Sequence, residues 1–144
     1  MIRTLALSLL AAACTPLHHS IEPYASDPAQ AAILDTRASL YCAALQPGAT
    51  LPPHPFTTDG CSMFPDGDWV RCCIEHDFAY WCGGSARQRE EVDRVLGECL
   101  EDLGYPRMAW WMHKGVRLAG HPWWPFPWRW GYGWPWPRGY ERSP

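Results

Sequence analysis

Residues 72–99 bring together side chains that could catalyse hydrolysis: an adjacent cysteine pair, a His-Asp pair and a further aspartate. On a helix, His76 follows Cys72 by four residues and shares its face, while Asp77 shares the adjacent face with Cys73. A histidine whose tautomer is fixed by a carboxylate can act as a general base. A second carboxylate can bind a hard cation. We therefore predict a base, an acid that orients it and a carboxylate that holds a metal.

Two helices must position these groups. The first is expected at about 68–82, where two glycines end it. The second begins with a capping box at 85–88 and ends before Gly104. Its apolar residues recur at helical spacing and indicate a face that packs against the first helix: Val92, Val95, Leu96, Cys99, Leu100 and Leu103.

The two helices are expected to run antiparallel. If Cys72 bonds Cys99, an equal axial rise along both helices places Asp93 between the levels of His76 and Tyr80. The carboxylate of Asp93 would then lie within reach of both side chains. It is the acid that we expect to orient the histidine.

The rest of the helical region is predicted from capping and breaking residues. An aspartate cap followed by proline and glutamine starts a helix at 27–30, and apolar residues including Ile33 and Leu40 follow at helical spacing. Proline and glycine make 49–67 a loop. A weaker helical stretch is expected from residue 106 to about 119. We predict one all-α domain at 27–120.

The N-terminal residues 1–14 are typical of an export signal, with one basic residue, a short apolar run and small residues. Leu10-Ala11-Ala12-Ala13-Cys14 resembles a bacterial lipobox, which predicts acylation at Cys14. Ordinary cleavage, or retention as a core segment, are the alternatives. Residues 15–26 would be a tether. We expect an exported protein, either an outer-membrane or periplasmic lipoprotein or a secreted one.

The cysteine count fits an oxidising compartment. Besides Cys14 there are six cysteines, an even number that suits three disulfides: Cys42, Cys61, Cys72, Cys73, Cys82 and Cys99. A zinc site is the alternative, but an adjacent pair lacks the spacing that zinc ligands usually have. Spacing alone leaves the pairing open.

The C-terminal residues 121–144 form a cationic segment rich in tryptophan and proline. Frequent proline excludes regular helix or central strand, so we expect it to lie outside the disulfide-linked core with exposed indoles. Trp and Tyr favour membrane interfaces, and Arg129 and Arg138 would meet anionic head groups. Stacking on a glycan or binding of a protein partner are the alternatives.

The charge distribution argues against a nucleic-acid partner. Residues 1–106 hold 6 basic and 14 acidic residues, whereas residues 107–144 hold 6 basic and one acidic. The main body is therefore acidic and carries no basic patch.

The residues of the two central helices resemble motifs of the secreted phospholipase A(2) family. The family's first motif is C-C-x-x-H-D-x-C-Y, and this chain has C-C-I-E-H-D-F-A-Y at 72–80. The second family motif, Cys-Asp-Arg followed by a later cysteine, corresponds to V-D-R at 92–94 and Cys99 with the same spacing. Ala79 and Val92 replace two cysteines that bond each other in the family, so one disulfide is lost at both ends together.

The resemblance covers roughly residues 57–103 and implies roles for the site. His76 would be the base that activates water, Asp93 its orienting acid and Tyr80 a hydrogen-bond partner of Asp93. Asp77 would bind calcium as the cofactor. The substrate would be the sn-2 ester of a phospholipid, which makes a phospholipid membrane the expected partner.

The resemblance also implies how the cysteines pair. Its bridges correspond to Cys72–Cys99 and Cys61–Cys73, and Cys42 and Cys82 are the two cysteines that remain for a third. The loop near Asp77 departs from the family's glycine-rich C-G-x-G-G pattern, since Cys61 is followed by S-M-F-P-D-G. The positional matches to the calcium-binding carbonyls are Gly60, Ser62 and Phe64, and Asp66 could replace one of them.

These observations predict a small disulfide-linked, phospholipase A(2)-like all-α domain with two long antiparallel helices and an irregular C-terminal tail. The expected function is calcium-dependent hydrolysis of phospholipids. The alternative is a catalytically inactive envelope lipoprotein that uses the same scaffold and its tryptophan-rich tail to bind lipid, glycan or a protein partner.

Overall fold

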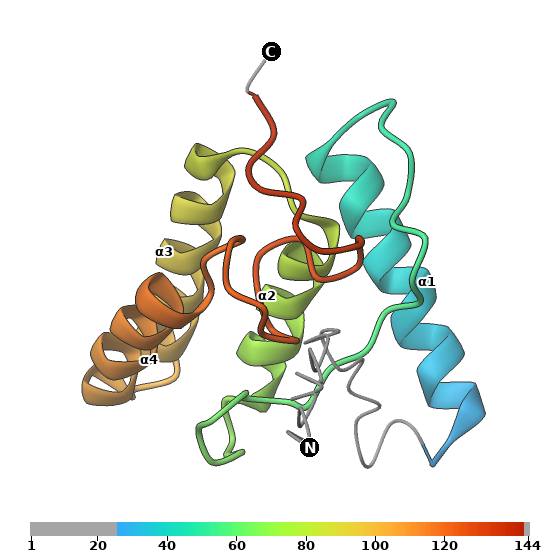
Figure 1. Cartoon of the computed structure of the whole chain (residues 1–144). Coiled ribbons are helices and arrows are strands. Elements are labelled where there is room, and N and C mark those ends of the chain that lie inside the picture. The colour runs from blue at the N-terminus through green and yellow to red at the C-terminus, as the bar shows by residue number, and fades with distance from the viewer. Residues whose placement is uncertain (1–25, 143–144) are drawn as a thin grey trace, which may run out of the picture.

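A computed structural model describes residues 26–142 and contains four α-helices and no strand within that range. The helices are α1 (Pro28–Leu45), α2 (Val70–Cys82), α3 (Ala86–Asp102) and α4 (Pro106–Ala119) (Figure 1). The predicted all-α class is confirmed. The expectations for the signal segment, for Cys14 and for nearly all of the tether lie outside the described residues. None of the four helices combines the length and apolar character that crossing a bilayer requires.

Helix α2 lies at the centre of the fold, with α1 on one side and α3 on the other (Figure 1). Nine of its residues are buried: Cys72, Cys73, Ile74, His76, Phe78, Ala79, Tyr80, Trp81 and Cys82. Residues 78–82 are buried in succession, so this half of the helix is enclosed on all sides, whereas Arg71 and Glu75 are exposed in the first half. Side chains that project from α2 are therefore fixed in place.

Three disulfides tie the surrounding elements to α2. Cys42–Cys82 joins α1, Cys72–Cys99 joins α3, and Cys61–Cys73 joins the loop before α2. The two pairings that the resemblance implied are confirmed, and so is the third, between the two cysteines that remained. Each such bridge contributes typically about 2–4 kcal/mol. The helix that carries the His-Asp pair is thus linked covalently to both neighbouring helices and to the loop.

The two flanking helices begin with the predicted caps. Asp27 accepts a hydrogen bond from the backbone of Ala29, and Ser85 and Gln88 form the reciprocal capping box of α3. In α1 the buried face differs from the expected one, since Leu34, Ala38 and Cys42 are buried while Ile33 and Leu40 are exposed. The bridge from Cys42 to α2 determines which face of α1 turns inward.

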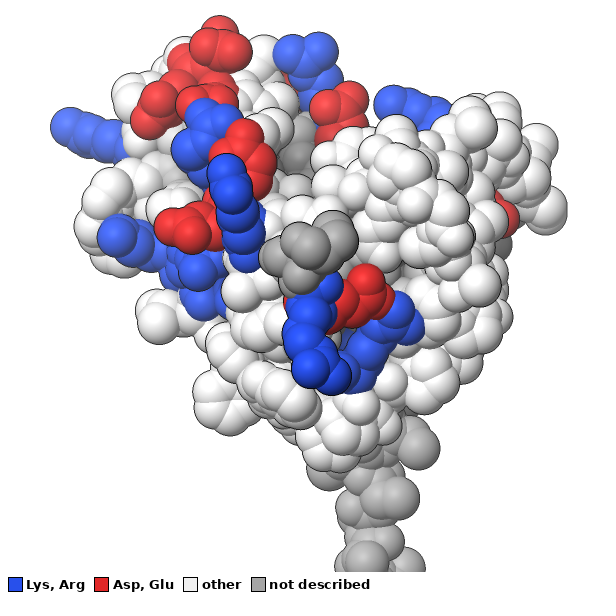
Figure 2. Space-filling model, turned by 90° about the horizontal axis from the view of Figure 1, so that it is seen from above, with Lys and Arg blue, Asp and Glu red and all other residues white. Residues whose placement is uncertain are grey.

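The outer face of α3 is charged. Arg94 pairs with Glu91 and Glu98 on this exposed surface. On the face seen in Figure 2, Lys and Arg side chains alternate with Asp and Glu and form no continuous basic surface. Such exposed pairs contribute little to stability.

The C-terminal segment packs across the end of α2, so the expectation that it lies outside the core is wrong for residues 129–134. The Trp130 indole donates a hydrogen bond to the Gly84 carbonyl at 2.9 Å, and the Trp134 indole donates to the Cys82 carbonyl at 2.8 Å. The backbone amide of Gly131 donates to Tyr80. The last carbonyls of a helix have no partner within the helix. The C-terminal segment supplies N–H donors for these carbonyls. The prolines of the segment gave no indication of this packing.

Close backbone approach makes this packing possible. Gly83 has a φ of +77°, which favours glycine, and a Cβ there would lie 2.9 Å from the Cα of Gly131. Arg129 is fully buried and donates to the carbonyl of Gly131 at 2.6 Å. Burial lowers the pKa of Arg129 to about 10. The expectation that Arg129 meets lipid head groups is therefore wrong, because its guanidinium is enclosed by the segment itself.

Arg138 is also engaged within the segment. Its guanidinium lies 3.4 Å from the centre of the Trp134 ring and pairs with Glu141. Other tryptophans of the segment remain exposed, among them Trp123, Trp124 and Trp136. The segment thus divides into a buried part that completes the fold and an exposed aromatic part.

Candidate active site

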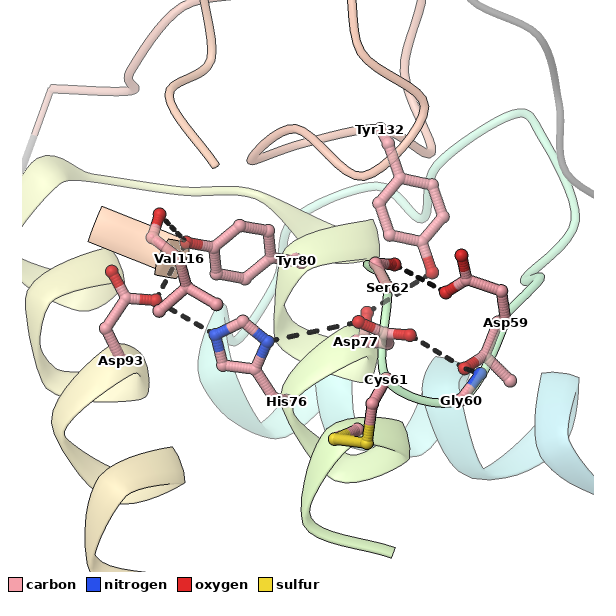
Figure 3. A network of polar contacts seen from close by, with 12 residues as sticks. Asp59, Gly60, Cys61, Ser62, His76, Asp77, Tyr80, Asp93, Val116 and Tyr132 are labelled. Atoms are coloured by element: carbon pink, nitrogen blue, oxygen red, sulfur yellow. Dashed lines mark hydrogen bonds and ion pairs between the residues drawn. A yellow bond between two sulfur atoms is a disulfide. The ribbon is translucent and has the colours of Figure 1, made fainter. Parts of the chain in front are cut away.

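His76, Tyr80 and Asp93 meet in the core between α2 and α3 (Figure 3). The Nε2 atom of His76 lies 2.9 Å from Oδ1 of Asp93, and the Tyr80 hydroxyl donates to the same oxygen at 2.7 Å. Asp93 is fully buried. Gly120 leaves room for this group, because a Cβ there would lie 2.4 Å from the Tyr80 hydroxyl oxygen. The predicted proximity of the three side chains is confirmed.

The charges of this group determine the tautomer of the histidine. Burial raises the pKa of Asp93, but hydrogen bonds from His76, Tyr80 and Arg117 outweigh burial and leave that pKa below its ordinary value. An ionised Asp93 can only accept, so the neutral imidazole carries its hydrogen on Nε2. The other nitrogen, Nδ1, then has a free lone pair and lies 3.9 Å from Asp77 (Figure 3).

The same surroundings favour protonation of the histidine. Burial lowers the pKa of His76, whereas the hydrogen bonds and negative charges of Asp77 and Asp93 raise it. The raising effects together are larger, so the pKa lies above its ordinary value. An imidazole that gains a proton here is stabilised by carboxylates on both sides. This is the behaviour that a general base requires.

Asp77 points away from Asp93, towards the loop before α2. The Thr58 hydroxyl donates to Oδ2 of Asp77 at 2.7 Å, and the Ser62 hydroxyl donates to Asp59 (Figure 3). Burial raises the pKa of Asp77, and the nearby charge of Asp59 raises it further, against the lowering effects of His76 and Thr58. Two carboxylates therefore share this corner, and the charge of one raises the pKa of the other.

The oxygen atoms in the corner around Asp77 are suitable ligands for a hard cation. A small cavity of about 10 Å³ is lined by oxygen-bearing residues, including Asp59, Ser62, Asp77 and Tyr132. Calcium prefers such oxygen ligands. Within residues 26–142, no group of three or more His, Cys, Asp or Glu side chains is placed to hold a metal ion. Hydroxyl and carbonyl oxygens would have to complete the ligand set of a calcium ion.

The other predicted calcium ligands are placed differently. Ser62 lines the small cavity beside Asp77, and Gly60 and Phe64 line the larger apolar cavity described below. Asp66 lines neither cavity, since its Oδ1 accepts the backbone N–H of Cys61 at 2.9 Å. Asp66 braces the loop from within and does not face Asp77 across either cavity.

Asp59 was not predicted from the sequence. It lies two residues before Cys61, just outside the positions that the family pattern assigns to calcium. The run Thr58-Asp59-Gly60 was the available signal, because a short polar residue next to glycine often marks a loop that approaches a ligand.

A second cavity of about 320 Å³ opens over His76 and Asp77. Its walls are apolar and come from the loop, from α4 and from the C-terminal segment, with Met63, Phe64, Met112, Val116 and Trp128 among them. A mostly apolar cavity with a few polar groups is typical of a small-molecule site. An acyl chain could enter it and bring an ester to the histidine.

Two arginines that the sequence did not single out complete the surroundings of Asp93. Arg117 of α4 donates to Oδ2 of Asp93 at 2.8 Å, and Nε of Arg89 lies 3.7 Å from the same oxygen. Arg89 also donates to the Tyr80 hydroxyl at 3.1 Å. In the sequence both arginines read as ordinary solvated residues of a helix, and no local pattern marks them as partners of a buried acid.

No family model, curated protein or solved structure matches this chain. The likeness to secreted phospholipases A(2) therefore rests on the motif residues, and the activity of this protein is a matter for proposal.

Proposed function

We propose that this protein is an exported, calcium-dependent phospholipase of the A(2) type, which hydrolyses the sn-2 ester of phospholipids. One observation carries the proposal. His76 is held by Asp93 at Nε2 while its Nδ1 faces Asp77 at the floor of an apolar cavity. This arrangement suits a base that activates water beside an apolar substrate.

The side chains supply a complete proton path. Nδ1 of His76 can take a proton from a water molecule that attacks the ester carbonyl, and Asp93 keeps the ring oriented and stabilises the imidazolium. The imidazolium can then return the proton to the leaving alcohol. The apolar walls exclude bulk water and accommodate an acyl chain. Phospholipids combine a long apolar chain with an ester, which fits both parts of the site.

Asp77 and Asp59, with Ser62, are the residues that would hold calcium. Bound there, calcium supplies Lewis-acid stabilisation of the negative charge that develops on the ester oxygen. The chain's own part is to keep the two carboxylates in place, through Thr58 on Asp77 and Ser62 on Asp59.

The test of this function is positional analysis of the products. Mixed micelles of a phospholipid labelled in its sn-2 chain should release that chain in calcium and not in excess chelator. Release of the sn-1 chain, or equal release with and without calcium, would contradict the proposal. Lipid binding without hydrolysis would instead favour the inactive lipoprotein.

Calcium binding should depend on Asp77 and not on Asp66. Calcium at about 100 times its Kd should stabilise the protein by about 2.7 kcal/mol, measured as a rise in the midpoint of thermal unfolding. Asp77→Asn should abolish most of this rise, because it removes a charge from the site while an amide oxygen can still accept from Thr58. Asp66→Asn should keep it, since the amide oxygen can still accept from Cys61. The opposite result would place calcium in the loop beside Asp66.

An exposed apolar rim supports a membrane as the source of the substrate. We define the apolar rim as Met63, Leu118, Trp124, Phe126 and Trp128. Met63, Leu118 and Trp128 line the apolar cavity. The Trp124 indole donates to the Leu118 carbonyl, and the rings of Trp124, Phe126 and Trp128 follow one another in contact. An apolar surface continuous with the cavity would let a lipid chain leave the bilayer without crossing water.

Leu118→Gln should weaken binding to phosphatidylcholine vesicles by about tenfold, since it removes an apolar side chain worth roughly 1.5–3 kcal/mol when buried. Leu118 is 76% exposed on α4, and Leu40, which is 67% exposed on α1, offers a matched control. Leu40→Gln should leave vesicle binding unchanged in the same co-sedimentation assay. Equal effects of the two substitutions would show that the apolar rim does not contact the bilayer.

A further inference from the structure

We propose that Arg117 is a positioning residue, which holds the carboxylate of Asp93 in the orientation that His76 needs. This inference rests on the hydrolytic function proposed above. It assigns a role in catalysis to a residue that touches neither the apolar cavity nor the corner around Asp77.

The two oxygens of Asp93 have separate sets of donors. Oδ1 accepts from Nε2 of His76 at 2.9 Å and from the Tyr80 hydroxyl at 2.7 Å, both from α2. Oδ2 accepts from Nη1 of Arg117 at 2.8 Å, on the opposite side. Rotation of the carboxylate would break hydrogen bonds on both sides at once. Arg117 therefore fixes which oxygen faces the histidine.

Arg89 anchors the backbone from which Arg117 projects. Its Nη2 donates to the carbonyls of Val116 and Arg117, both at 2.8 Å, and its Nη1 donates to the Tyr140 hydroxyl at 2.6 Å. These carbonyls belong to the last turn of α4, and that of Val116 also accepts from the N–H of Gly120 at 2.9 Å. The buried arginine thus locks the end of α4 and sets the place from which Arg117 reaches Asp93.

Charge gives Arg117 a second effect. Asp93 is fully buried, and an isolated carboxylate in such a place would favour its neutral form. The hydrogen bond from Arg117 joins those from His76 and Tyr80 in lowering the pKa of Asp93, so the carboxylate has a cationic partner besides the imidazole. Asp93 can then act as an acceptor throughout the cycle and does not itself take up the proton from His76.

Arg117 is better suited to mutation than Arg89. Its side chain is 35% exposed and its guanidinium makes one hydrogen bond to Asp93 at the edge of the core. Arg89 is fully buried and binds five partners, so its loss would disturb the fold. The test therefore compares Arg117→Gln and Arg117→Lys, with Arg107→Gln as a control for an exposed arginine on the same helix.

Arg117→Gln should lower kcat by about 10- to 100-fold on micellar phospholipid, because a small misplacement of a reacting group can cost about 10²-fold. KM should change less than about twofold, because Arg117 does not line the apolar cavity and its loss removes no contact with the bound substrate. Arg117→Lys should recover most of kcat, since an ammonium can still donate to Asp93. Arg107→Gln should match the wild type. An equal kcat in Arg117→Gln and Arg107→Gln would overturn the proposal.

A second measurement does not depend on turnover. In alkaline solution, where the ring is neutral, ¹⁵N shifts of His76 should show one tautomer with the hydrogen on Nε2 in the wild type and in Arg117→Lys. Arg117→Gln should show a mixture of tautomers while unfolding at a similar temperature. A single tautomer in all three would overturn the proposal. If the wild type releases no fatty acid, the proposed function fails, and the tautomer measurement alone decides whether Arg117 positions Asp93.

Discussion

His76→Gln is expected to reduce calcium-dependent release of fatty acid by roughly 10²- to 10⁴-fold, the usual contribution of a general base. The glutamine amide can still donate to Asp93, so the buried carboxylate keeps a partner. It cannot accept and carry a proton in place of Nδ1. The loss should appear in kcat, measured on micelles above the KM of the wild type.

The control is a histidine outside the site. His113 lies on α4 and does not line the apolar cavity, so His113→Gln should keep the rate of the wild type. Calcium should still stabilise His76→Gln, because Asp77 and Asp59 remain. If His76→Gln hydrolyses lipid at the wild-type rate, the activity does not arise from this site.

Trp130→Ala should cost about 3–5 kcal/mol of unfolding free energy, as truncation of a buried aromatic side chain commonly does. Trp130 is fully buried, and its ring meets the Tyr80 ring edge to face at 5.1 Å between centres. Alanine would leave a cavity beside Tyr80 and remove one of the two donors to the Gly84 carbonyl, the other being the N–H of Glu141. Denaturant unfolding with the disulfides intact measures the loss.

Trp123→Ala provides the matched comparison within the same segment. Trp123 is 54% exposed, and its truncation should cost less than about 1 kcal/mol. If the two substitutions cost the same small amount, the C-terminal segment does not belong to the core. That result would restore the expectation of a separate tail that the sequence alone suggested.

The meeting of His76, Tyr80 and Asp93 could be predicted because it depends on regular geometry. Helical spacing places the first two on one face, and a bridge between Cys72 and Cys99 sets the level of the neighbouring helix. Both relations can be computed from positions in the chain. The catalytic role of these residues stays a prediction.

The packing of Trp130 and Arg129 could not be predicted by the same means. Proline removes any periodic signal from their segment. Trp130 donates to the Gly84 carbonyl just beyond α2, far away in the sequence, and Arg129 donates to carbonyls of its own irregular segment. Asp59 could not be predicted for a related reason, since its approach to Asp77 depends on the conformation of an irregular loop. The buried face of α1 also depended on a partner, because Cys42 and its bridge, not apolar residues such as Ile33, decide it.

The attachment of the C-terminal segment to α2 also bears on which parts of the chain the molecule needs before its site is complete. Residues 121–142 follow the whole helical region, so without them carbonyls at the end of α2 lack their donors. Trp128, one wall of the apolar cavity, belongs to the same segment. A chain that ends after α4 would contain His76, Asp77 and Asp93 and would still lack the wall that closes the apolar cavity. We expect the protein to become competent only once this segment has packed against α2.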